Sequence, residues 1–347
     1  MAITKSEFGK TKKNEDASLY TITNANGMKA VVSDFGAVLV SLFVPDKDGK
    51  LRDVVWGYDK VSGYENNGVY LGSTIGRNAN RIGKAKYTLN GKEYELEKND
   101  GQNNLHGGFD GYNARMWQCE LNEAGNAVTF TLESKDMDQG FPGNAKIAVT
   151  YILTDDNEIK ITYKASADKD TIFNMTNHSY FNLDGETSDS VLEHEVFIDA
   201  DAYTEADDES IPTGKIINVD NTPMDFRKYR VIGKDIDADY EQLRFGGGYD
   251  HNWVLNKTDG PVASMRSLNS KIKMEVYTDL PGMQLYTGNF LAGEEGKNGK
   301  KYARRSASCF ETQYFPDAIN HDNFKAPVFK AGEEYNTTTT YKFMVEA

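Results

Sequence analysis

The chain has 347 residues, a length between one large domain and two ordinary ones, and 12% of them are aromatic, which argues against a disordered chain. Its 39 basic and 53 acidic side chains give a net charge of −14, spread along the whole sequence, so a polyanion such as nucleic acid would be repelled. The longest strongly apolar stretch, residues 37–44, is far shorter than the ~20 residues that span a bilayer. We therefore expect neither a nucleic-acid nor a membrane partner.

Two cysteines, Cys119 and Cys309, are too few for a disulfide framework or a zinc cluster. They are either two free thiols or one bridge. The first ten residues, MAITKSEFGK, lack the apolar centre of a signal peptide, which predicts a cytoplasmic protein, although a leader already removed would leave the same sequence. Nothing in the sequence indicates the oligomeric state.

Strand patterns follow one another along the chain. Residues 19–23 and 28–32 read as a hairpin around Asn-Ala-Asn-Gly, and residues 69–75 form a β-like run. A stronger hairpin is predicted at residues 87–96, because Asn90-Gly91 suits the positive φ angles of a type I′ turn.

Apolar residues then alternate at 147–153 and resume the same alternation at 159–163. Residues 235–243 could form a short helix, and residues 335–345, rich in Thr, Tyr and Phe, suit a half-buried strand. No repeat or low-complexity linker interrupts the chain. The sequence therefore predicts an all-β fold, a large antiparallel sandwich, as a single domain over residues 1–347.

Polar residues that turns and solubility do not require gather in five segments: 76–82 (GRNANRI), 103–108 (NNLHGG), 173–183 (FNMTNHSYFNL), 246–252 (GGGYDHN) and 309–320 (CFETQYFPDAIN). In strand alternation, Thr176, His178 and Tyr180 share one face. Glu311 lies among Phe, Thr and Tyr, where an unpaired carboxylate is costly, so a functional role is favoured. The Gly246–Gly248 run reads as a mobile turn leading to Asp250.

Several kinds of chemistry could use the polar residues of these five segments. His106, His178, Asp250 and Glu311 could ligate zinc, but their spacings lack the usual short ligand pair, apart from Asp250 beside His251. Neither a phosphate-binding loop of the G-x-x-x-x-G-K-[ST] type nor a G-x-S-x-G elbow occurs. We expect no metal and no cofactor. Two histidines and two carboxylates with amide and guanidinium donors suit binding a polyol and moving protons on it.

Six motifs, in this order and spacing, closely resemble the aldose 1-epimerase family, the galactose mutarotases: GRNANRI, LHGG, NMTNHSYFNL, YDHNWVL, PGMQLYTGNFL and ETQYFPDAIN. The resemblance covers nearly the whole chain. It implies a β-sandwich with a sugar in a cleft on one sheet, and interconversion of the α and β anomers of free aldohexoses such as D-glucose and D-galactose, without a cofactor.

The resemblance also implies roles for single residues. Glu311 falls at the general base and His178 at the general acid. The sugar-binding positions are Asn80, Arg81, His106, Tyr180, Asp250 and Gln284. For this chemistry the pair would start as carboxylate and imidazolium, and we expect Asp250 and Glu311 to favour the imidazolium.

Three alternatives remain at this point. A glycoside hydrolase would use Asp250 and Glu311 as its two carboxylates. A catalytically silent sugar-binding module would need neither Glu311 nor His178. A hexose-6-phosphate epimerase would need extra cations at the mouth of the cleft, and Arg77 is the obvious spare one.

Overall fold

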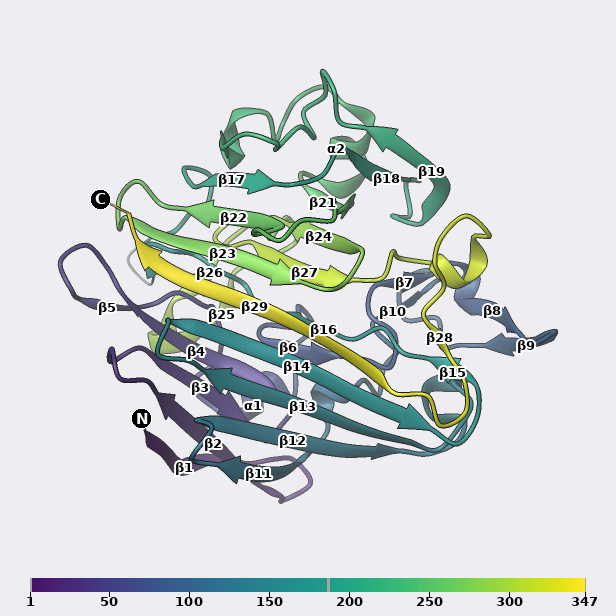
Figure 1. Cartoon of the computed structure of the whole chain (residues 1–347), viewed down its shortest axis with the longest axis horizontal. Coiled ribbons are helices and arrows are strands. Elements are labelled where there is room, and N and C mark those ends of the chain that lie inside the picture. Colours follow the sequence, from purple (N-terminus) through teal and green to yellow (C-terminus); the bar gives the residue numbers. More distant parts are fainter. Residues whose placement is uncertain (1, 186–187, 347) are drawn as a thin grey trace.

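The computed structural model of the protein describes residues 2–185 and 188–346. One layer of it is an antiparallel sheet of nine strands, in which β29 lies in the middle between β14 and β23 (Figure 1). In spatial order these strands are β11 (Gln118–Asn122), β12 (Ala127–Ser134), β13 (Ala145–Leu153), β14 (Glu158–Ala167), β29 (Tyr335–Val345), β23 (Ile272–Thr278), β22 (Ala263–Arg266), β17 (Glu195–Ile198) and β20 (Arg230–Val231).

Two antiparallel sheets of five strands pack against this layer. The first contains β1 (Ala2–Lys10), β2 (Asp16–Thr23), β3 (Lys29–Ser33), β4 (Val38–Pro45) and β5 (Leu51–Asp53). The second, in spatial order, contains β19 (Pro212–Asn218), β18 (Ala202–Ala206), β21 (Asp250–Val254), β24 (Gly282–Tyr286) and β27 (Cys309–Gln313). The second sheet positions much of the site described below.

The hydrophobic core lies between these sheets and follows from the two-residue period of the strands. In β13, Ile147, Val149 and Tyr151 are buried, while the residues between them are half-buried or exposed. The same buried cluster takes Val32 from the first five-stranded sheet and Trp253 from the second. Burying a large apolar side chain stabilises the fold by about 1.5–3 kcal/mol, so this contiguous cluster holds all three sheets together.

Shorter elements connect the layers. The remaining strands form pairs: β6 (Ser73–Ile75) with β16 (Thr176–His178), β7 (Arg81–Ile82) with β10 (Asn104–Leu105), β8 (Lys86–Leu89) with β9 (Lys92–Glu95), β15 (Thr171–Ile172) with β28 (Val328–Phe329), and β25 (Glu294–Glu295) with β26 (Lys301–Tyr302). The α-helices of the described chain, α1 (Val61–Tyr64) and α2 (Glu241–Gly246), are both short. Neither is long or apolar enough to cross a membrane.

The predicted all-β fold and its main strands are confirmed. β2 pairs with β3, and β8 pairs with β9 around Asn90 and Gly91, whose φ angles of 52° and 76° are those of a type I′ turn. The predicted strands at 147–153, 159–163 and 335–345 are β13, β14 and β29.

Two local predictions are wrong. The helix expected at residues 235–243 begins only at Glu241, because Asp235 and Asp237 instead pair with Arg230 and Arg305 in a series of turns. The β-like run at residues 69–75 is a strand only at its last three positions.

The positive φ angle of Tyr70 breaks that run. Gly72, also at positive φ, breaks it a second time.

Candidate active site

Three neighbouring strands present polar side chains on one face. In the register of β21, β24 and β27, Gln284 lies opposite Asn252 on one side and Glu311 on the other, and Asp250 is two residues before Asn252. The alternate residues of these strands, including Leu285 and Phe310, point into the core. The two-residue period therefore separates the site from the core within the same three strands.

His178, the last residue of β16, faces Glu311. Its Nε2 atom lies 3.6 Å from Oε1 of Glu311, and both side chains are buried. On the other side of the ring, Nδ1 lies 3.5 Å from Sγ of Cys309. The ring packs beside that of Tyr180, with 5.1 Å between centroids. The nitrogen that faces Glu311 is thus held toward it by contacts on the rest of the ring.

The opposite wall comes from β7, β10 and the residues beside them. The backbone N–H of Asn80 donates to Nδ1 of His106 at 3.1 Å, and the N–H of His106 donates back to the carbonyl of Asn80 at 3.0 Å. Arg81 donates from Nε to Asp100 at 2.8 Å, which fixes its guanidinium at the edge of the site. Tyr70 places its ring 4.6 Å from that of His106.

These side chains enclose a pocket of about 140 Å³. All eight residues predicted from the sequence line it: Asn80, Arg81, His106, His178, Tyr180, Asp250, Gln284 and Glu311. Segments that are up to 231 residues apart in sequence, from Asn80 to Glu311, therefore meet in one place.

Aromatic residues of the pocket were missed. Tyr70, Tyr286 and Phe290 also line it, and Phe290 is 60% exposed at its rim. Tyr286 follows Gln284 by two residues on β24, so the strand period was a signal for it. Tyr70 gave no such signal, because its position depends on a positive φ angle within a strand-like sequence.

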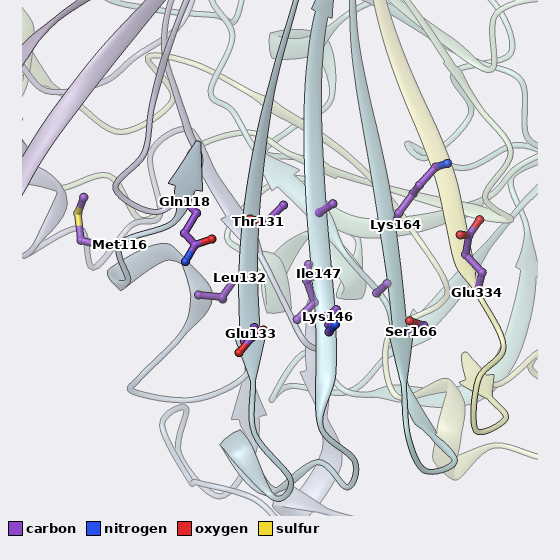
Figure 2. A pocket seen from close by; sticks show the side chains of 12 residues that line it. Met116, Gln118, Thr131, Leu132, Glu133, Lys146, Ile147, Lys164, Ser166 and Glu334 are labelled. Atoms are coloured by element: carbon purple, nitrogen blue, oxygen red, sulfur yellow. The ribbon is translucent and has the colours of Figure 1, made fainter. Parts of the chain in front are cut away.

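A larger hollow of about 430 Å³ lies over strands β12, β13 and β14, and Figure 2 shows its side chains. Its charged groups are Glu133, Lys146, Lys164 and Glu334, and no histidine lines it. It offers no buried acid–base pair of the kind formed by His178 and Glu311. We therefore place the site by its chemistry and not by the size of the cavity.

Burial opposes charge on both members of the pair. It raises the pKa of Glu311 well above the ordinary value, and the nearby Asp250 carboxylate adds to this rise. Burial lowers the pKa of His178 to about 4. The expectation that neighbouring carboxylates hold His178 as imidazolium is therefore wrong, and of the two groups Glu311 holds a shared proton more strongly. Burial also raises the pKa of Asp250, which the Arg81 guanidinium and the Gln284 amide oppose.

His106, His178 and Glu311 each have a potential metal-binding atom within 4.8 Å of the others. These distances would suit a divalent cation. However, Nδ1 of His106 accepts the Asn80 hydrogen bond, so Nε2 carries the ring proton and has no lone pair for a metal. The donor set suits a sugar hydroxyl better than a cation.

Arg77, expected to be a spare cation at the mouth, is fully buried away from the pocket. Its guanidinium donates to the Pro142 carbonyl at 2.8 Å and to the Ser134 hydroxyl at 2.5 Å. This expectation was wrong, because so many fixed acceptors stabilise the guanidinium inside the fold. Arg77 thus joins the segments around residues 134 and 142 to the loop that carries Arg81.

Two further expectations are resolved by the structure. The glycine run is the C-terminal cap of α2 and not a mobile turn, since Gly247 and Gly248 donate to the carbonyls of Arg244 and Leu243, and Asn289 holds the loop from Gly246. Cys119 and Cys309 are both free thiols, so the bridge is excluded.

The fold and the pocket together define a class of protein: an antiparallel β-sandwich with a buried carboxylate–imidazole pair in a small polar pocket. The sequence profile of the family described as aldose 1-epimerase matches residues 18–342. The galactose mutarotase of Bos taurus is 41% identical over 92% of each chain, and the aldose 1-epimerase of Escherichia coli K12 is 41% identical over 94% of this chain and 95% of its own.

Solved structures agree. A GalM/aldose epimerase homologue from C. elegans superposes with a TM-score of 0.89 at 33% identity, covering 95% of this chain and all of its own. Galactose 1-epimerase from Lactobacillus acidophilus NCFM gives a TM-score of 0.88 at 27% identity, with 100% and 99% covered. The chain belongs to the aldose 1-epimerase family, and it is an isomerase that interconverts the anomers of aldoses.

Proposed function

We propose that Glu311 and His178 are the general base and general acid of this anomer exchange, with D-glucose and D-galactose as substrates. The observation that carries this proposal is the 3.6 Å separation between the His178 Nε2 and the Glu311 Oε1, both buried in the pocket. Groups this close can serve the two neighbouring oxygens of one anomeric centre in the same step.

The chemistry needs two proton transfers. Glu311 takes the proton of the anomeric hydroxyl, the C1–O1 bond becomes a carbonyl, the bond from C1 to the ring oxygen breaks, and His178 gives that oxygen a proton. Rotation about the C1–C2 bond presents the other carbonyl face, and the transfers then reverse. Each positioned acid or base contributes about 10²–10⁴-fold to the rate.

Burial has two opposing effects on this couple. A carboxylate with a raised pKa is a stronger base, and an imidazolium with a lowered pKa is a stronger acid, so both transfers gain driving force. The same shifts reduce the fraction of protein in which Glu311 is ionised and His178 is protonated. Between the two pKa values the pair carries one proton in total, which is the number that the exchange requires.

The remaining polar groups suit the other sugar hydroxyls. We assign Asn80, Arg81, His106, Asp250 and Gln284 to hydrogen bonds with the substrate. Tyr180 contributes its ring, since its hydroxyl donates to the Val69 carbonyl at 2.8 Å. The reaction moves only protons and one C–O bond, so no metal and no cofactor takes part.

The pocket is lined by residues from Gly68 to Glu311, and one contiguous core cluster joins all three sheets. We therefore propose that residues 1–347 work as a single domain. The cytoplasm, where free aldoses are metabolised, is the proposed location, and the sugar is the proposed partner.

Polarimetry on freshly dissolved α-D-glucose and α-D-galactose with catalytic amounts of protein tests this function. We expect the optical rotation to reach its equilibrium value faster than in buffer. A glycoside hydrolase using Asp250 and Glu311 would instead release reducing sugar from a disaccharide and leave mutarotation unchanged, and a silent sugar-binding module would do neither. A hexose-6-phosphate epimerase lacks support, because the cation expected for it, Arg77, is buried elsewhere.

A further inference from the structure

Two buried amide side chains lie behind the pocket without lining it. Gln313 is fully buried on β27, two residues after Glu311 and on the same face of the strand. Asn252 is 2% exposed on β21 and lies opposite Gln284 in the strand register. Figure 1 shows that β21, β24 and β27 belong to the same part of the molecule. The Gln313 and Asn252 side chains therefore meet on the side of Gln284 that faces away from Asp250.

Hydrogen bonds join these amides in one direction. Nε2 of Gln313 donates to Oδ1 of Asn252 and to Oε1 of Gln284, each at 3.2 Å. Nε2 of Gln284 then donates to Oδ1 of Asp250 at 2.8 Å. Because an amide has its acceptor and its donors at opposite sides, Gln313 fixes the orientation of Gln284. With its carbonyl held by Gln313, Gln284 must turn its NH₂ group to Asp250.

The opposite orientation of Gln284 would place a carbonyl oxygen against a carboxylate oxygen. That contact would repel, and it would remove the donor that helps to keep Asp250 ionised against the effect of burial. An ionised Asp250 held in one place is a strong acceptor for sugar hydroxyls. The orientation of Gln284 thus decides how well Asp250 can bind the substrate.

We propose that Gln313 is a positioning residue for substrate binding: it orients the Gln284 amide, and through it the Asp250 carboxylate. This inference rests on the proposed role of Asp250 in sugar binding. Gln313 does not line the pocket and acts only through its neighbours.

The first test is Gln313→Met, which keeps nearly the same volume and removes the donor. We expect KM for α-D-galactose to rise about tenfold, because a misoriented Gln284 loses its hydrogen bond to the charged Asp250, and we expect kcat to stay within about twofold because the acid–base couple stays intact. Gln313→Asn is the second variant, since it keeps an amide in the buried position but is too short to reach both acceptors. It should raise KM in the same way.

Gln242→Met is the matched control. Gln242 is also a buried glutamine with two hydrogen bonds, which it makes to the backbone of Ala206, and neither residue lines the pocket. Its replacement should lower the thermal unfolding temperature much as Gln313→Met does, while KM stays unchanged. A similar rise of KM in the control would show that loss of stability alone explains the effect and would overturn the proposal.

A double-mutant cycle with Asp250→Asn separates positioning from general damage. An asparagine at this position has both a donor and an acceptor, so it can pair with either orientation of Gln284. Gln313→Met should then change KM by less than about twofold in the Asp250→Asn background, since the two residues act through one interaction. Equal fold losses in both backgrounds would mean that Gln313 acts by another route.

The outcomes also distinguish this inference from the site assignment. If Asp250→Asn left KM unchanged, the role of Asp250 would be wrong, and the positioning role of Gln313 with it. If Asp250→Asn raised KM while folded Gln313→Met and Gln313→Asn did not, Asp250 would keep its role and only the inference about Gln313 would be wrong.

Discussion

The backbone N–H of Asn80 points at Nδ1 of His106, and this contact determines which nitrogen of the ring carries its proton. A second proton on Nδ1 would bring two N–H groups against each other, and burial lowers the pKa of His106 well below its ordinary value. His106 therefore remains a neutral ring with its Nε2–H directed to the pocket. A neutral donor at this position can bind a sugar oxygen without repelling a protonated His178.

Metal removal should leave the activity intact. We expect extensive dialysis against a chelator to leave kcat and KM unchanged, since His106 has no free lone pair and the reaction requires only proton transfer. The measurement is polarimetry before and after dialysis, with the metal content checked in parallel. A loss of rate that one divalent ion restores would contradict the proposal that no metal takes part.

Glu311 and His178 should act as one unit. Glu311→Gln keeps the shape but cannot accept the hydroxyl proton, and His178→Asn cannot deliver one to the ring oxygen. Each should lose several decades in kcat, and the double variant should lose little more than the worse single variant, because the two groups serve the same step. Sugar binding by calorimetry and the thermal unfolding temperature serve as controls for folding. Near-normal kcat in Glu311→Gln at saturating sugar would refute the mechanism.

The same couple determines the pH dependence. The lowered pKa of His178, about 4, marks the loss of the pair's first proton, and the raised pKa of Glu311 places the loss of the second above the range of an ordinary glutamate. The rate should therefore rise with pH as the first proton leaves. It should fall again at higher pH as the pair loses its remaining proton. The apparent pKa values belong to the pair and not to either residue. The Glu311→Gln variant should lack the acidic limb as far as its residual rate can be followed.

Arg81→Ala and Asp250→Ala should mainly weaken sugar binding. Losing a hydrogen bond to a charged group costs about 1.5–3 kcal/mol, or roughly one to two decades in affinity. Calorimetric Kd values and the division of the effect between KM and kcat provide the measurement. Normal affinity with abolished turnover in either variant would mean that binding and catalytic roles had been exchanged.

Stability should fall in mild acid. Burial lowers the pKa of His178, His194 and His251 to about 4. Below their ordinary pKa the unfolded chain therefore takes up protons that the folded protein refuses. Each such histidine reduces the free energy of unfolding by at most about 1.4 kcal/mol per pH unit between roughly pH 6.5 and 4.

His194 lies outside the pocket and accepts a hydrogen bond from the Leu183 backbone at 3.1 Å, which a glutamine oxygen could also accept. Urea unfolding of wild type and His194→Gln at pH 7, 6 and 5 should show a weaker loss in the variant. The contribution of the acidic groups is common to both proteins and cancels in this comparison. An identical pH dependence would show that His194 titrates normally.

The sequence predicts local structure best where one short signal decides it. Asn90-Gly91 specifies its turn, and the alternation at 147–153 specifies both the strand and its buried face. The helix expected at 235–243 failed because ion pairs with Arg230 and Arg305, one of them far away in sequence, hold Asp235 and Asp237 in turns. The helix propensity of a segment takes no account of ion-pair partners that lie outside it.

In the site, too, some features could be predicted from the sequence and others depended on the fold. Its residue types and motifs were visible in the sequence, and the resemblance supplied their roles. The direction of the pKa shifts was not predictable, because it depends on how completely Glu311 and His178 are enclosed. Gln313 was equally hidden, since its importance comes from the residues that it orients and not from its own neighbours in sequence.

The two arginines of the GRNANRI segment, Arg77 and Arg81, are four residues apart and have unrelated roles. Arg77 is fully buried inside the fold, and Arg81 lines the pocket. A screen of variants that recorded only sugar turnover would score both positions as essential. Measuring the yield of folded protein beside the turnover would separate them: substitutions at Arg77 should deplete the protein itself, and those at Arg81 should leave it abundant and weakly binding.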